Sequence, residues 1–292
     1  MKKADKEYIG NKDQLVLISL FSLFSDKKAM GKTRKSKAKQ SKPLYSAFQN
    51  WPDQSYLKNR DLLVQSSVKT KKFRQLPLVV AGSSHVKKWG FQKELKGQFW
   101  KGLQNRQRLG VFPGPILGIP GGKLDSGDRF IELAKDVASR PGYEGQIFVL
   151  VLGTNDASES PDPIEYSQRY EKLCQTLLSV PQLVLLPASL LPRKPNTRYP
   201  HRNANMYTLS NVIRNVVRNL KKTKESEKRI SYVNVHLNIA KVIVKPKQEN
   251  QLIPFVGMLQ KDNVHLTPKA NALFAANVLK GVSFVDVANF QK

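Results

Sequence analysis

Four side chains of types suited to breaking an acyl ester bond occur in three short stretches of this 292-residue chain. Ser84 ends a Gly-Ser-Ser stretch, Asn155 lies in a Gly-Thr-Asn-Asp stretch, and Asp262 and His265 share an Asp-Asn-Val-His stretch. A serine can act as a nucleophile when a histidine, oriented by a carboxylate, takes its proton. An asparagine amide can stabilise the oxyanion that then forms. These residue types therefore predict hydrolysis of an acyl bond through a covalent serine intermediate.

Two apolar runs place Ser84 and Asn155 just after buried strands. Residues 76–81 precede Ser84, residues 147–152 precede Asn155, and a glycine follows each run. Short apolar runs rich in β-branched residues that end at a glycine are typical of buried strands followed by tight turns. Because ligands of α/β folds bind at the carboxyl ends of parallel strands, we expect both side chains at the same edge of a sheet.

Asp262 and His265 precede a predicted helix near the end of the chain. Residues 268–279 carry apolar side chains at helical spacing, Thr267 is suited to the N-cap, and Pro268 is suited to the first helical position. The acid and the base are therefore expected on the loop that enters the last helix.

Four blocks of the sequence resemble those of the SGNH hydrolases, also called the GDSL esterase/lipase superfamily, in the family's own order. Residues 82–84 resemble the first block, which holds the serine, and residues 116–122 resemble the glycine block. Residues 153–156 match the Gly-x-Asn-Asp block, and residues 262–267 match the final Asp-x-x-His block. One short motif recurs by chance, whereas four in order over residues 75–282 are a specific signal.

The resemblance implies a role for each matching residue. Ser84 is similar to the family's nucleophile, His265 to its general base, and Asp262 to the carboxylate that orients the base. The implied oxyanion hole consists of the backbone N–H groups of Ser84 and Gly121 and the side-chain amide of Asn155.

Two positions beside the expected nucleophile depart from the family pattern. Ser83 stands where the family has an acidic residue, and His85 stands where it has an apolar one. Because both flank Ser84 on a tight turn, we expect their side chains to point away from the base. Taken singly, the Ser-Ser and Asn-Asp pairs also fit ordinary turns, in which such side chains bond to nearby backbone groups.

The sequence predicts neither a metal site nor a cofactor. No cluster of His, Cys and Asp residues has the spacing of a metal site. His201 and His236 are expected at surface or structural positions. Cys174 is the single cysteine, so it cannot form an intrachain disulfide, and we expect it in the apolar core.

The predicted fold class is α/β, a three-layer α/β/α domain with a five-stranded parallel sheet of flavodoxin-like type. Its strands are expected near residues 76–81, 111–117, 147–152, 182–188 and 231–236. The expected organisation is a basic, largely disordered N-terminal extension with a short apolar segment (1–43), a linker or packing segment (44–74), the hydrolase domain (75–282) and a C-terminal tail (283–292).

The chain is strongly basic, with 49 lysines and arginines against 22 acidic residues and a formal net charge of +27. Residues 30–43 form a low-complexity basic arm with little to bury, so we expect it to be disordered and to bind nucleic acid or another polyanion. The apolar run at residues 15–25 is too short for a transmembrane segment. It resembles a signal peptide only superficially, because the leader holds acidic residues and no small-x-small cleavage site is evident. A buried helix, a partner-binding segment and an upstream-extended reading frame stay open for it, and an intracellular location is favoured over secretion.

The substrate class expected is a short-chain or acetyl ester, or an acylated glycan or lipid. Two other classes stay open. One is a nucleic-acid-binding structural or accessory protein of a mobile element or virus, with a vestigial hydrolase fold. The other is a carbohydrate deacetylase that acts on polyanionic glycans. The full set of catalytic residue types favours an active enzyme, whereas the charge does not separate nucleic acid from an acidic glycan.

Overall fold

The computed structural model describes most of the region expected to hold the hydrolase domain. The described residues are 76–87, 91, 93–95, 97, 111–139, 145–224, 226–244 and 249–283. The predicted extension (1–43), the predicted linker (44–74) and all of the predicted tail except Ser283 lie outside the described residues. The boundaries expected there stay predictions.

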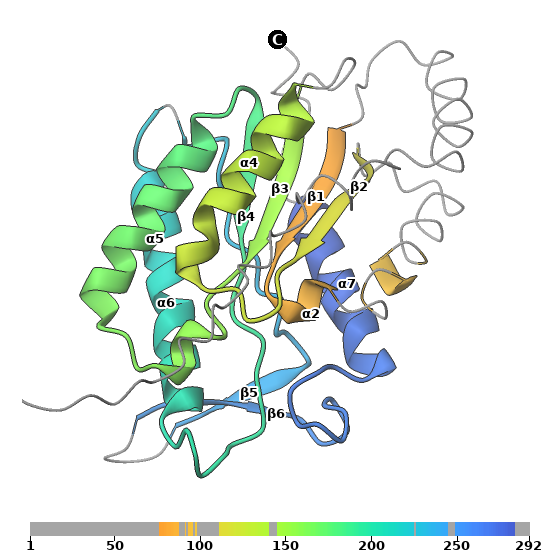
Figure 1. The fold of residues 1–292 in the computed structure, drawn as a ribbon, viewed down its shortest axis with the longest axis vertical. Coiled ribbons are helices and arrows are strands. Elements are labelled where there is room, and N and C mark those ends of the chain that lie inside the picture. Colours follow the sequence, from red (N-terminus) through yellow and green to blue (C-terminus); the bar gives the residue numbers. More distant parts are fainter. Residues whose placement is uncertain are drawn as a thin grey trace, which may run out of the picture. The chain divides into compact units, whose positions relative to one another are not determined.

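A parallel sheet forms the centre of the described part of the chain (Figure 1). Its strands are β1 (Leu76–Gly82), β2 (Val111–Gly118), β3 (Gln146–Val151) and β4 (Leu183–Pro187), in the spatial order β2-β1-β3-β4. Every residue of β1, β3 and β4 is buried. Continuous apolar runs fit this position because a parallel sheet is covered on both faces.

The fifth predicted strand lies beside β4 but is shorter than expected. Isolated parallel bridges join Leu185 to Ile230 and Ala188 to Val233, which gives the flavodoxin-like order predicted from the sequence. Beyond Val233 the ladder ends, because the N–H of Val235 donates to a serine side chain rather than to a strand, at 3.0 Å. The sheet therefore has four regular strands and one bridging segment in place of the fifth strand expected at 231–236.

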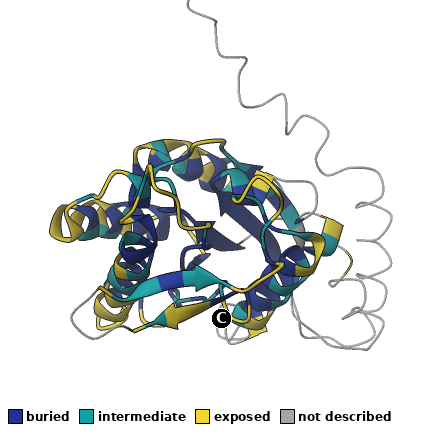
Figure 2. Ribbon diagram, turned by 90° about the horizontal axis from the view of Figure 1, so that it is seen from below, coloured by how far each residue is buried: buried dark blue, intermediate teal, exposed yellow. Residues whose placement is uncertain are grey.

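Helices cover both faces of the sheet, which confirms the predicted three-layer α/β/α class (Figure 1). On one face lie α4 (Gly127–Ala138), α5 (Pro163–Leu178) and α6 (Arg202–Leu220), and on the other lies α7 (Pro268–Ser283). The start of α5 follows from its sequence, since the Asp162 side chain caps the N–H of Ile164 at 3.0 Å. Figure 2 shows the strands as a buried centre and exposed residues on the outer sides of the helices.

The packing of α7 seals one side of the core. Phe274 and Val278 of α7 belong to the same buried cluster as Leu78 and Val80 of β1. Phe91 stacks on Phe274 with ring centroids 4.2 Å apart. Since burying each such side chain contributes about 1.5–3 kcal/mol, the last helix carries a large share of the stability of this layer.

Short elements follow the carboxyl ends of the strands. They are α2 (Ser84–Lys87), η2 (Leu124–Ser126), η3 (Asp156–Ser158) and a two-stranded antiparallel sheet of β5 (Ala240–Ile243) and β6 (Gln251–Pro254). In Figure 1 the β5–β6 sheet lies below the edge where the parallel strands end. None of the described helices combines the length and the apolar content needed to cross a bilayer.

Gly153, directly after β3, occupies a position that only glycine suits. Its φ is +119°, a conformation that other residues rarely adopt. A Cβ built there would lie 2.4 Å from the hydroxyl of Tyr166 and 3.0 Å from Leu190. Both the backbone conformation and the close packing therefore fix a glycine in front of the Asn-Asp pair.

We predict that Gly153→Ala lowers the free energy of unfolding by about 1–3 kcal/mol, which is the usual cost of a strained backbone position. Denaturant unfolding of the full chain measures this change. Gly97→Ala serves as the control, because no heavy atom lies within 4 Å of a Cβ built there and its φ is ordinary. Equal stability of the two variants would contradict the prediction.

Candidate active site

The turn after β1 separates two neighbouring serines. The N–H of Ser83 donates to Val151 O at 3.2 Å, and the carbonyl of Ser83 accepts from the N–H of Val86 at 3.1 Å. These bonds hold the Ser83 side chain inside the protein, where it is fully buried. Ser84, the first residue of α2, is only partly buried. Of the two serines, Ser84 is therefore the more accessible to solvent.

His85 ties this turn to the loop that carries the expected base. Its ring is buried, and Nε2 lies 3.0 Å from Val264 O. Since a carbonyl only accepts, Nε2 carries the hydrogen, and Nδ1 is left to accept from the Ser83 hydroxyl at 3.4 Å. Burial, helped by the charge of Arg193, lowers the pKa of His85 to about 3. The ring is therefore neutral at neutral pH.

The expectation that both flanking side chains point away from the base does not hold for His85. Its ring centroid lies 6.0 Å from that of His265. The reason is a tertiary contact, because the hydrogen bond to Val264 O holds the His85 imidazole against the loop that contains His265. Ser83 differs, since its hydroxyl turns inward to His85.

Asp262 and His265 form a hydrogen-bonded pair on the loop before α7. His265 Nδ1 lies 2.5 Å from Asp262 Oδ2. The other carboxylate oxygen accepts the backbone N–H groups of Val264 and His265 at 3.0 and 2.9 Å. These bonds, led by that from the His265 N–H, hold the pKa of Asp262 well below its usual range. With Nδ1 bonded to the carboxylate, Nε2 is the ring atom that can exchange a proton with a substrate group.

The segments that carry the nucleophile candidate and the base are linked through His85. Ser84 is the chain neighbour of His85, whose ring lies beside that of His265. Among the hydrogen bonds of the described residues, none joins Ser84 to His265. In ligand-free structures catalytic hydrogen bonds are often long and shorten when substrate binds. The structure thus brings Asp262 and His265 into contact and joins the turn of Ser84 to their loop through His85.

The glycine block passes beside the turn that holds Ser84, because the first glycine of the block permits close approach. A Cβ on Gly118 would lie 2.1 Å from the backbone nitrogen of Lys87 in α2. The next residue, Ile119, donates its N–H to Gly82 O at 2.8 Å. Gly121 follows with a φ of +68°, and within the described part of the chain its N–H has no hydrogen-bond partner. That N–H is available as an oxyanion donor.

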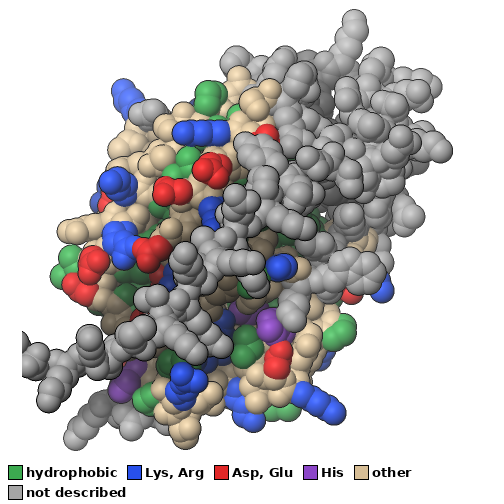
Figure 3. Space-filling view, in the orientation of Figure 1, with side chains coloured by type: hydrophobic (Ala, Val, Ile, Leu, Met, Phe, Trp, Pro, Cys, Tyr) green, Lys and Arg blue, Asp and Glu red, His purple; other side chains and the backbone are tan. Residues whose placement is uncertain are grey.

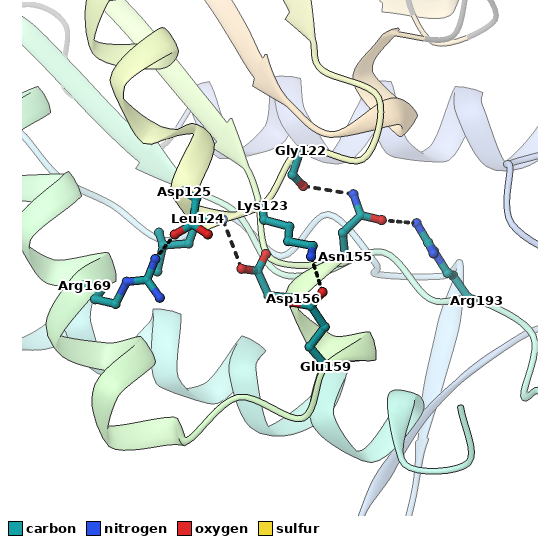
Figure 4. Close-up of polar contacts among 9 residues, drawn as sticks. All are labelled: Gly122, Lys123, Leu124, Asp125, Asn155, Asp156, Glu159, Arg169 and Arg193. Carbon is teal, nitrogen blue, oxygen red and sulfur yellow. Dashed lines mark hydrogen bonds and ion pairs between the residues drawn. The ribbon is translucent and has the colours of Figure 1, made fainter. Parts of the chain in front are cut away.

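The Asn155 side chain is held at both ends of its amide (Figure 4). Its Nδ2 donates to Gly122 O at 2.9 Å, and its Oδ1 accepts from Arg193 Nη2 at 2.6 Å. The predicted oxyanion donor is therefore in contact with the glycine block that contains Gly121.

Polar contacts next to Asn155 also join the segment after β3 to the segment that follows the glycine block, as Figure 4 shows. The buried carboxylate of Asp156 accepts the N–H of Leu124 at 3.0 Å, and burial raises the pKa of Asp156. Two ion pairs, Lys123 with Glu159 and Arg169 with Asp125, lie outside it. Because exposed ion pairs contribute little to stability, the bond between Asp156 and Leu124 is the main contact that holds these two segments together.

Sequence reasoning missed Arg193, on the loop after β4. The loop is fixed by two further bonds: Asn203 Nδ2 donates to Arg193 O at 3.0 Å, and the N–H of Lys194 donates to Asn263 O at 3.1 Å. Burial, helped by the charge of Arg202, lowers the pKa of Arg193 to about 10. A basic residue following the fourth predicted strand was the available signal, since that strand ends at the same edge.

The remaining candidate residues lie elsewhere. His201 is exposed just before α6, and His236 Nδ1 lies 3.3 Å from Leu190 O, where burial lowers the pKa of His236 to about 4. Cys174 is a buried free thiol in α5. Within the described residues, no group of three or more His, Cys, Asp or Glu side chains is arranged to hold a metal ion.

The neutral state of His85 predicts a pH-dependent stability. The unfolded chain takes up a proton on His85 near pH 6.5, whereas the folded chain does so only near pH 3. Between these values the unfolded state binds more protons, so the free energy of unfolding falls as the pH falls. His236, whose pKa is also lowered by burial, reduces the free energy of unfolding at acidic pH in the same way. We predict a lower Tm at about pH 4.5 than at about pH 7.5, and a smaller difference in His85→Gln. An equal pH dependence in His85→Gln would contradict this assignment.

One family of known proteins matches a large part of the chain. A model of the GDSL-like lipase/acylhydrolase family matches residues 116–278. The matched region begins after Ser84 and contains Gly121, Asn155 and the Asp262–His265 pair. A search of curated proteins finds no match to the chain.

Several solved structures resemble the chain at low sequence identity. The lipase/acylhydrolase from Enterococcus faecalis has 15% identity and a TM-score of 0.49, over 72% of this chain and 96% of that one. A family 3 carbohydrate esterase from Clostridium thermocellum has 12% identity and a TM-score of 0.49, over 74% and 98%. A GDSL-like lipase from Bacteroides thetaiotaomicron has 16% identity and a TM-score of 0.47, over 77% and 97%. Since the family model matches more than half of the chain, the protein belongs to the GDSL-like lipase/acylhydrolase family, the SGNH hydrolases that its four sequence blocks resemble.

Proposed function

We propose that this family member is a serine esterase in which Ser84, His265 and Asp262 form the catalytic triad. The observation that carries the proposal is the contact between His265 Nδ1 and Asp262 Oδ2, which leaves Nε2 free to act as the base. The bond from His85 to Val264 O supports it, because it joins the turn bearing Ser84 to the loop bearing His265.

The proposed reaction has two steps. Ser84 Oγ bonds to the acyl carbon while its proton passes to His265 Nε2, and that proton then goes to the alkoxide as the bond to the leaving alcohol breaks. Water next attacks the acyl-serine and gives a proton to His265, which returns it to Ser84 as the acid leaves. Asp262 stabilises the imidazolium in both steps without taking a proton itself.

Three N–H donors are proposed to stabilise the oxyanion that forms in each step. They are the backbone N–H groups of Ser84 and Gly121 and the second amide hydrogen of Asn155. Gly122 O accepts only one of the two hydrogens on Asn155 Nδ2. Removing one donor of this kind costs about 2.7–4 kcal/mol of transition-state stabilisation.

We predict that Ser84→Ala and His265→Ala each abolish hydrolysis of p-nitrophenyl acetate while the protein stays folded. Asn155→Ala is expected to lower kcat by about 10²–10³, because it removes an oxyanion donor but keeps the nucleophile. A serine-directed phosphonate should label Ser84, as read by mass spectrometry of peptides. A series of p-nitrophenyl esters tests the proposed preference for short acyl chains.

Ser83→Ala is the matched control for Ser84→Ala. The Ser83 hydroxyl faces His85 in the interior, so its loss is expected to leave most of the activity. Phosphonate labelling of Ser83, or activity that survives in Ser84→Ala, would overturn the triad.

The basic arm is proposed as the polyanion-binding part of the chain. Figure 3 shows acidic side chains interspersed with Lys and Arg on the face over α4 and α5, so that face offers no uniform positive surface. The arm at residues 30–43, by contrast, contains many lysines and no acidic residue. Neutralised phosphates release counterions, which makes such binding sensitive to salt and insensitive to sequence.

We predict that removing residues 1–43 strongly weakens binding to RNA or DNA but leaves turnover of a small neutral ester nearly unchanged. Affinity of the full chain is expected to fall steeply between about 50 and about 200 mM salt, as measured by fluorescence anisotropy. Equal binding by the full and shortened chains would assign the contact to other basic residues. Strong nucleic-acid binding in a full chain that hydrolyses no ester would favour the vestigial-hydrolase alternative.

A further inference from the structure

The orientation of the Asn155 amide is set by two neighbours that can each bond in only one way. Gly122 O can only accept, so it must face the amide nitrogen, which lies 2.9 Å away. The guanidinium of Arg193 can only donate, so it must face the amide oxygen, which lies 2.6 Å from Nη2. A flipped amide would set two donors against each other at Arg193 and two acceptors against each other at Gly122.

This orientation determines whether Asn155 can serve the proposed reaction. Only the nitrogen end carries hydrogens, and Gly122 O accepts one of the two. The second can reach an oxyanion only while the oxygen end stays with Arg193. We propose that Arg193 is a positioning residue that fixes the amide of Asn155 as an oxyanion donor. The inference rests on the proposed function, because it assumes that role for Asn155.

The guanidinium of Arg193 is held mainly by its bond to Asn155. No ion pair between Arg193 and a carboxylate occurs among the described residues, and its buried Nε has no hydrogen-bond partner there. The charge of Asp262 favours the charged guanidinium without forming an ion pair with it, whereas burial opposes that charge, so the guanidinium needs a hydrogen-bond partner. The short bond to Asn155 Oδ1 is that contact in this structure.

Backbone bonds tie Arg193 to the other half of the site. The neighbouring Lys194 donates its N–H to Asn263 O at 3.1 Å, and Asn263 lies between Asp262 and His265. The Asn203 side chain holds the carbonyl of Arg193 at 3.0 Å. The loop after β4 therefore links the amide of Asn155 to the loop of the acid and the base.

The test is a double-mutant cycle on ester hydrolysis by the full chain, with Arg193→Met, Asn155→Ala and the double variant. We expect Arg193→Met to lower kcat by about 10- to 100-fold, in line with loss of one hydrogen bond to a charged group, and to leave KM nearly unchanged. In the Asn155→Ala background the same change should cost less than about threefold, because residues that act through one another are not additive. Arg193→Lys keeps a charged donor and should recover part of kcat.

Arg198→Met is the matched control. Arg198 lies on the same loop and contacts Tyr199, with its guanidinium carbon 5.4 Å from the ring centroid, and its backbone N–H bonds only to Asn196 Oδ1. Loss of this arginine should leave kcat unchanged. Thermal unfolding of each variant checks the fold, and if Arg193→Met does not fold, the cycle is run with Arg193→Lys.

The outcomes separate this inference from the proposed function. An unchanged kcat in Arg193→Met, or effects of Arg193→Met and Asn155→Ala that multiply in the double variant, would overturn the role of Arg193 while leaving the triad intact. An unchanged kcat in Asn155→Ala, or no ester turnover by the wild-type chain, would overturn the proposed oxyanion hole itself.

Discussion

The hydrogen bond from the buried His85 ring to Val264 O is the constraint on which the candidate site depends. It joins two segments that are 179 positions apart in the chain, the turn after β1 and the loop before α7. An unpaired polar group at this depth would be costly, so the ring and the carbonyl hold each other in place. The neutral state of His85 follows from the same burial, and it lets the ring accept from Ser83 while it donates to Val264.

The candidate site is built from the loops that follow the four parallel strands. Parallel strands bring the ends of β1, β2, β3 and β4 to one edge, so each following loop contributes a different group without any need for a special backbone path. Bonds between these loops then set the finer geometry. Gly82 O holds the glycine block, Gly122 O holds Asn155, and Asn263 O holds the loop of Arg193. Rigidity at the site thus comes mainly from contacts between loops.

The sequence predicted the parts that depend on local pattern. Continuous apolar runs identified β1 and β3, and Thr267 with Pro268 identified the start of α7, where Thr267 Oγ1 accepts the N–H of Ala270 at 3.4 Å. Periodicity does not single out Arg193 among 49 basic residues, and its place after the fourth predicted strand was the one available signal. Its contact with Asn155 exists only after the sheet has formed. The fifth strand was predicted too long for a similar reason, since a serine side chain ends its ladder.

The Asp262–His265 pair stands directly before α7, and α7 closes one face of the core. The last part of the domain to leave the ribosome therefore supplies both the final core layer and the acid–base pair. Under the proposed mechanism, a chain that stops early, near residue 260, keeps Ser84 and Asn155 but lacks the base that would take the serine's proton. If the proposed triad holds, such a truncated product has no esterase activity at all. Ester turnover would accordingly report that synthesis has passed the last helix and that this helix has docked.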